Sequence, residues 1–155
     1  MATQRILVPY NFMSYDQKVL DFVIRNFARQ EDVEITLFKS YTPLPDIESH
    51  KSPVMAKLKS NLSFMTTKIK EMEEGLRKVK QDLLKSGFSD NQVQVIFKPK
   101  KKKNIGSEII ALAMQHPFDV IVLNHKPGKI AHFFTGNVFS KIITTLENVA
   151  VCVVT

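Results

Sequence analysis

The chain has 155 residues, a formal net charge of +7, 44% hydrophobic residues and a single cysteine, Cys152. This length suits one domain over residues 1–155 with a sizeable core, and one cysteine excludes an internal disulfide framework or a cysteine-rich zinc site. No apolar run approaches the roughly 20 residues of a membrane helix. The first residues lack the long apolar stretch of a secretory signal, so we expect a cytoplasmic protein.

The first part of the chain predicts a strand, a helix and a second strand. A short apolar run over residues 5–8, closed by Pro9, indicates a buried strand. Apolar residues at helical spacing predict a helix over about 14–30, and Ser14 with Gln17 three residues later forms the pattern of a capping box at its start. The β-branched residues of 33–41 are typical of a strand. A long loop with three prolines follows.

Residues 54–85 predict one long helix, which Gly87 ends as a C-cap. Its apolar residues recur at alternating spacings of three and four, as in the seam of a coiled coil. Gly75 lies inside the pattern and should lower the stability of the helix by about 1 kcal/mol relative to alanine. The helix either lies along the sheet and a neighbouring helix, or it also extends beyond the domain and pairs with a partner. The seam residues are Met55, Leu58, Leu62, Met65, Ile69, Met72, Leu76, Val79 and Leu83.

The rest of the chain continues the alternation of strands and helices. Strands are predicted over 92–98, 118–123 and 149–154, and helices over 105–115 and 138–146. This order predicts an α/β fold with a five-stranded parallel sheet flanked by helices on both faces, a Rossmann-like architecture. In such sheets ligands bind beyond the carboxyl ends of the strands, where the strand order reverses. The candidate loops there are 9–13, 40–43 and 124–137.

Three segments of the sequence resemble the universal stress protein (UspA-like) family. They are ILVPYNF in the first strand, EITLFKSYTP in the second, and FDVIVLNHKPGKIAHFFTGNVFSKIITTLENVAVCVVT at the end. The resemblance implies an adenine nucleotide alpha hydrolase-like fold, a non-catalytic role in the stress response and dimers that form through the last strand. One branch of the family binds ATP through a loop G-x-x-G, nine residues, then G-[ST].

That loop departs from the family pattern at most of its defining positions. The first glycine falls on Asn124, the second on Lys126 or Pro127, and Gly128 is out of register. Gly136 matches the last glycine, but Asn137 replaces the hydroxyl residue. Glycines let backbone N–H groups approach phosphates closely, so the resemblance implies weak or absent binding of ATP or another adenine nucleotide.

Further positions complete the candidate nucleotide site that the resemblance implies. Pro9 matches the end of the family's first strand, whereas Asn11 replaces the acidic residue that meets the adenosine. Ser40 replaces an apolar residue that would line the adenine. Leu123 and Val138 flank the altered loop on its two sides.

Much of the positive charge gathers in one run between a strand and a helix: Lys98, Lys100, Lys101, Lys102 and Lys103. The run is either a solvated loop or a patch that binds anions or an acidic partner. Aromatic residues for stacking on bases are not interleaved with it, so we expect no specific nucleic-acid binding.

The sequence shows no constellation of a nucleophile with a base, and His125 and His132 lack a third metal ligand nearby. We therefore expect neither catalysis nor a metal site. Val149, Val151 and Val153 lie on a final strand that could pair across a two-fold axis. Three hypotheses follow: a dimeric regulator that acts through protein partners, an ATP-binding protein with slow hydrolysis, and an anion-binding or acidic-partner-binding domain.

Overall fold

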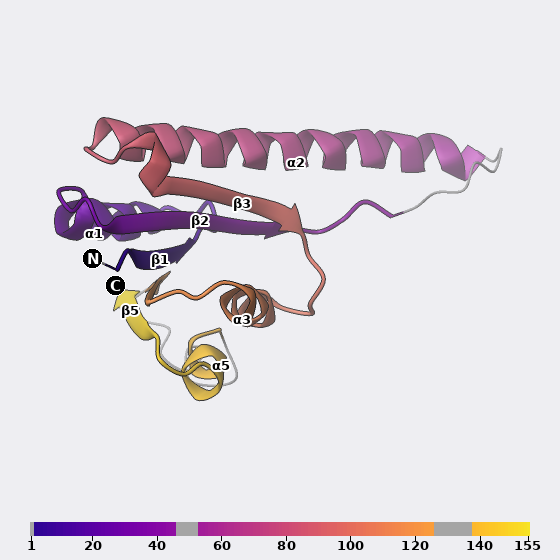
Figure 1. Ribbon diagram of the computed structural model, residues 1–155. Coiled ribbons are helices and arrows are strands. Elements are labelled where there is room, and N and C mark those ends of the chain that lie inside the picture. Colours follow the sequence, from indigo (N-terminus) through magenta and orange to yellow (C-terminus); the bar gives the residue numbers. More distant parts are fainter. Residues whose placement is uncertain (1, 46–52, 126–137) are drawn as a thin grey trace.

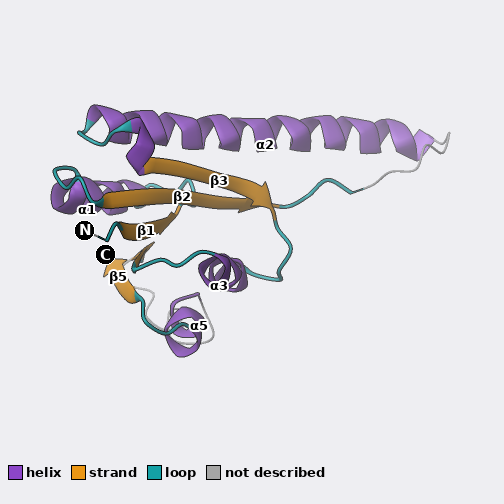
Figure 2. Ribbon diagram, viewed as in Figure 1, coloured by secondary structure: helices purple, strands orange, loops and turns teal. Residues whose placement is uncertain are grey.

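The protein forms one parallel sheet with helices on both faces (Figures 1 and 2), in a computed structural model that describes residues 2–45, 53–125 and 138–155. The elements are β1 (Gln4–Pro9), α1 (Asp16–Phe27), β2 (Val33–Tyr41), α2 (Pro53–Lys85), β3 (Val93–Pro99), α3 (Ile105–Gln115), β4 (Val120–Asn124), α5 (Val138–Thr145) and β5 (Ala150–Val154). A short 3-10 turn, Asp90–Gln92, precedes β3.

The strand order is β3-β2-β1-β4-β5, and every neighbouring pair is parallel. Ile6 of β1 pairs with Ile35 of β2 on one side and with Val120 of β4 on the other. The order reverses between β1 and β4, so the carboxyl ends of these two strands form the switch point. The predicted fold class is confirmed.

Two apolar clusters hold the layers together. On one face of the sheet, α1 and α2 contribute Val19, Val23, Leu76 and Leu83, all of them buried. On the other face, α3 and α5 cover β1 and β4, with Ile142 of α5 completely buried. Because side chains alternate between the faces of a strand, each central strand supplies residues to both clusters.

Several boundaries differ from the sequence-based prediction, most clearly at α1 and at the start of β4. α1 begins at Asp16, and Tyr15 at the N-cap position makes no side-chain hydrogen bond, so the capping box predicted for Ser14 and Gln17 is wrong. Instead, the Asp16 carboxylate accepts hydrogen bonds from backbone N–H groups of the preceding loop. β4 begins at Val120, and Phe118 precedes it and packs against the cluster on the α3/α5 face.

α2 ends as the sequence predicts. Gly87 has a left-handed φ of 117°, the N–H of Phe88 donates to the Leu83 carbonyl at 3.3 Å, and the N–H of Gly87 donates to the Leu84 carbonyl at 3.2 Å. This is a Schellman motif with its usual apolar contact, since Phe88 and Leu83 are buried in one cluster.

None of the described helices is long and apolar enough to cross a membrane.

Candidate functional site

The switch point is occupied by a buried carboxylate, that of Asp16, which is 1% exposed. One of its oxygens accepts the backbone N–H of Asn11 at 3.1 Å and that of Met13 at 2.8 Å. The other oxygen accepts the side-chain amide of Asn124 at the end of β4. A single carboxylate therefore ties the β1–α1 loop to the carboxyl end of β4.

An aromatic contact holds the same loop from the other side. Phe12 has a φ of 60°, a conformation that a non-glycine residue rarely adopts. Its ring packs edge-on against Tyr10, with ring centroids 4.9 Å apart, and lies so close to Gly75 of α2 that a Cβ there would be 2.5 Å from the ring. The glycine inside the long helix thus makes room for Phe12.

Two titratable side chains near Asp16 have shifted pKa values. Burial raises the pKa of Tyr10 above 10.0, with smaller contributions in the same direction from Asp16 and Asp82. Burial lowers the pKa of Lys39 below 10.5, and the negative charge of Asp16 opposes that shift. The switch point therefore combines one buried anion with a partly buried cation that is costly to keep charged.

The structure brings some of the predicted nucleotide-site residues together and separates others. Pro9, Asn11 and Asn124 lie around Asp16 at the switch point. Ser40 lies on β2, and because strand side chains alternate it shares the α3/α5 face with Phe38. Leu123 is buried in the cluster on that face.

The remaining positions of the predicted site belong to the segment between β4 and α5. Val138 begins α5, and a Cβ on Gly106 of α3 would be 3.3 Å from the Val138 Cα, so the two helices approach closely there. Lys126, Gly128, Gly136 and Asn137 lie outside the described residues.

The lysine run forms a turn around a second buried carboxylate. Glu108 of α3 is 2% exposed and accepts the backbone N–H groups of Lys101 and Lys102. Asn104 caps the helix by accepting the N–H of Ser107 at 2.9 Å. The backbone of the run is thus fixed while the side chains of Lys101 and Lys102 are exposed. Lys98 lies over the Phe38 ring, 5.6 Å from its centroid.

Sequence reasoning missed both buried carboxylates. Glu108 had a visible signal, because it lies three and four residues from Ile105 and Leu112 on the apolar stripe of its helix. Asp16 had a weaker one, an acid in the first turn of a predicted helix. Among the described residues, no group of three or more histidine, cysteine or acidic side chains is placed to hold a metal ion.

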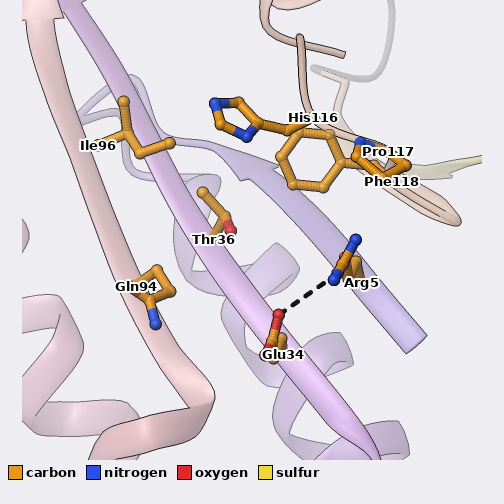
Figure 3. Close-up of a pocket in the computed structure, with 8 residues that line it drawn as sticks. All are labelled: Arg5, Glu34, Thr36, Gln94, Ile96, His116, Pro117 and Phe118. Atoms are coloured by element: carbon orange, nitrogen blue, oxygen red, sulfur yellow. Dashed lines mark ion pairs between the residues drawn. The ribbon is translucent and has the colours of Figure 1, made fainter. Parts of the chain in front are cut away.

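A separate hollow of about 330 Å³ lies at the opposite end of the sheet, near the amino ends of β1, β2 and β3 (Figure 3). An ion pair between Arg5 and Glu34, with nitrogen and oxygen 3.6 Å apart, lies on one side of it, and the segment that follows α3 lies on the other. None of the predicted site residues lines it. The lining residues are Arg5, Glu34, Thr36, Gln94, Ile96, His116, Pro117 and Phe118.

No protein-family model matches the sequence, and no curated protein matches it either. Solved structures do match over nearly the whole chain. The hypothetical protein MJ0577 is 19% identical, with a TM-score of 0.68 over 99% of this chain and 96% of that one. A universal stress protein in complex with cAMP is 14% identical, with a TM-score of 0.62 over 100% and 98%.

A third match is the universal stress protein from Archaeoglobus fulgidus in complex with dAMP, which is 16% identical with a TM-score of 0.60 over the whole of both chains. At these identities the similarity shows the fold. The chain therefore has the fold of the universal stress proteins, as its sequence predicts.

Proposed function

We propose that this chain is a universal stress protein-like regulator without catalytic activity, which acts as a dimer through protein partners and binds adenine nucleotides weakly or not at all. The hydrogen bond between the Asn124 amide and the buried Asp16 carboxylate carries the proposal. It spans the switch point, where a doubly wound sheet would receive a ligand.

Two polar groups at the switch point are already paired. The N–H of Asn11 donates to Asp16, and so does the side chain of Asn124. A nucleotide that used either group would have to break a hydrogen bond to a buried charge, worth about 1.5–3 kcal/mol.

The edge of the sheet supports the proposed dimer. Within the described residues, β5 pairs only with β4, and its sequence AVCVV carries no charge. Edge strands of monomers are usually protected by charges, proline or bulges. An apolar, uncharged edge is suited to antiparallel pairing with a second copy across a two-fold axis, with Val149, Val151 and Val153 at or beside the contact.

Two measurements test the proposal. Denaturation of the purified protein, followed by mass spectrometry of the released small molecules, should yield no adenine nucleotide in stoichiometric amount. Sedimentation velocity should show a dimer that Val151→Lys or Val153→Lys converts to a monomer. Stoichiometric nucleotide in the first experiment, or an unchanged sedimentation profile of both variants in the second, would refute the corresponding part.

The second candidate function is an ATP-binding protein with slow hydrolysis. Similar folds solved with cAMP and with dAMP favour it. In that case Asn11 and Asn124 would exchange Asp16 for the nucleotide, and Gly136 with Asn137 would meet the phosphates. The mass spectrum separates the two candidates, because a protein with a competent site should carry nucleotide through purification.

A further inference from the structure

The amino-terminal half of α2 extends beyond the sheet that its other half covers (Figure 1). The helix has 33 residues, or about 50 Å at 1.5 Å per residue, whereas the neighbouring β3 has seven, or about 23 Å. The buried residues of α2 are Leu76, Val79 and Leu83, all in its last third. Of the described side chains between Val54 and Gly75, none is buried.

The apolar seam nevertheless continues along this projecting half. Leu58 is 37% exposed, and Leu62, Met65 and Ile69 are only partly buried. None of these four belongs to either core cluster. The projecting half therefore presents a stripe of exposed and partly buried apolar side chains that lies outside both core clusters.

The period of the seam is compatible with a partner helix along the projecting half. Spacings of three and four alternate over four heptads, so the mean period is 3.5 residues. A straight α-helix drifts about 20° per heptad from such a repeat, and the same repeat continues through Leu76, Val79 and Leu83, which pack against the sheet. A strict seam is the pattern that interlocks with another helix.

The charges beside the seam indicate which kind of helix would fit. With Leu58 and Met65 as d positions, Lys59 lies at an e position and Lys68 at a g position, beside the contact. Residues 54–70 contain four lysines, Lys57, Lys59, Lys68 and Lys70, and no acidic residue. Of these four lysines, only Lys68 forms an ion pair between described residues, with Glu71 of the same helix at 2.9 Å.

The lysine run lies at the same end of the molecule. It follows β3, whose carboxyl end lies beneath the middle of α2, where the projecting half begins (Figure 1). The buried Glu108 carboxylate fixes its backbone and leaves Lys101 and Lys102 exposed. The run turns away from α2 toward α3 (Figure 1), so it adds to the positive field at this end of the molecule without forming part of the docking surface.

We propose that the projecting half of α2 docks an amphipathic helix of another protein that is apolar at its a and d positions and acidic beside them. This rests on the proposed function, in which the chain acts through protein partners, and names the surface and the chemistry of the partner. A second copy of this chain fits less well, because pairing two projecting halves would bring two sets of four lysines together.

The probe is a synthetic peptide about three heptads long, with leucine at a and d, glutamate at e and g, and a fluorescent label. A matched peptide carries lysine at e and g. Fluorescence anisotropy with the full chain should show binding of the glutamate peptide only. Raising the salt concentration from about 0.1 M to about 1 M should weaken it, because the Debye length falls from about 10 to 3 Å.

Substitutions within the seam give the structural test. The pair Leu62→Gln and Met65→Gln should weaken binding at least tenfold, because each removes an apolar side chain worth about 1.5–3 kcal/mol when buried. The matched control is Ser63→Gln with Thr67→Gln, two exposed positions of the same helix, which should change binding less than about twofold. Circular dichroism checks that every variant is folded.

A charge exchange gives the test of specificity. Lys59→Glu with Lys68→Glu should reverse the preference, so that the lysine peptide binds and the glutamate peptide does not. A merely structural effect of these exposed substitutions would weaken the binding of both peptides alike.

Four results would overturn the proposal. They are no binding of the glutamate peptide at about 100 μM, equal binding of both peptides, binding only to vesicles rich in phosphatidylglycerol, and self-association that Leu62→Gln with Met65→Gln abolishes. The first three results would not bear on the proposed β5 dimer or on the proposed weak binding of adenine nucleotides. Bound nucleotide or a failed Val151→Lys test would count against the proposed function without affecting the peptide results.

Discussion

The contact between Phe12 and Gly75 gives the sharpest prediction about the switch point. In an ordinary helix, Gly75→Ala would stabilise the protein by about 1 kcal/mol. Here the added Cβ would lie 2.5 Å from the Phe12 ring, so the ring must move. Phe12 is 38% exposed, so it can swing outward into solvent, and the fold as a whole should survive.

That movement has a cost that can be estimated. The edge-on pair of Phe12 with Tyr10 should be worth about 0.5–1.5 kcal/mol beyond its buried area, and the ring also loses its contact with α2. We expect Gly75→Ala to change the free energy of unfolding by about zero or to lower it. In a Phe12→Ala background the same substitution should raise it by about 1 kcal/mol. The coupling energy between the two sites should then be about 1–2 kcal/mol.

Urea denaturation followed by far-UV circular dichroism measures all four members of this cycle. Ser60→Ala, at an exposed position of α2 away from Phe12, is the control and should show the same small gain in both backgrounds. Equal stabilisation by Gly75→Ala with and without the Phe12 ring would refute the contact and the explanation for the glycine.

Three further predictions concern the buried carboxylates and Lys39. Asp16→Ala should lower the free energy of unfolding in urea by about 2–4 kcal/mol, because it leaves the N–H groups of Asn11 and Met13 without their acceptor; a loss under about 0.5 kcal/mol would contradict this. Glu108→Ala should lower the free energy of unfolding by about 1–3 kcal/mol. Glu108→Gln should lower it less, since glutamine keeps one acceptor oxygen for the backbone N–H groups of the lysine run. Equal losses would argue against hydrogen bonding as the cause. Lys39→Met should raise the melting temperature at pH 7, because burial lowers the pKa of Lys39 and its protonation favours the unfolded chain. That advantage should shrink as the pH rises through the lowered pKa toward 10.5, and an advantage that is constant with pH would show that charge is not its cause.

The fold was predictable from the sequence because its signals are local. Apolar runs in β1 and β4 and the helical spacing in α1 each identify an element without knowledge of its neighbours. The left-handed Gly87 was predictable for the same reason, since a helix that ends in glycine has a specific backbone geometry.

The switch point was harder to predict because its contacts join distant parts of the chain. Asn124 meets Asp16 across 108 positions of sequence, and Phe12 meets Gly75 only once α2 lies over the β1–α1 loop. The local capping signal of Ser14 was overridden by the Asp16 carboxylate, which accepts two loop N–H groups. Hydrogen bonds of this kind depend on tertiary placement, which spacing alone does not encode.

A calorimetric titration of ATP into the wild-type protein tests most directly whether the Asp16–Asn124 hydrogen bond keeps the switch point closed to nucleotide. We expect no saturable heat at ATP concentrations up to about 1 mM, equivalent to a binding free energy weaker than about 4 kcal/mol. Asn124→Ala, which removes the bridge, is the comparison. Saturable binding by the wild-type protein with a Kd in the micromolar range would show that this hydrogen bond does not close the switch point to nucleotide.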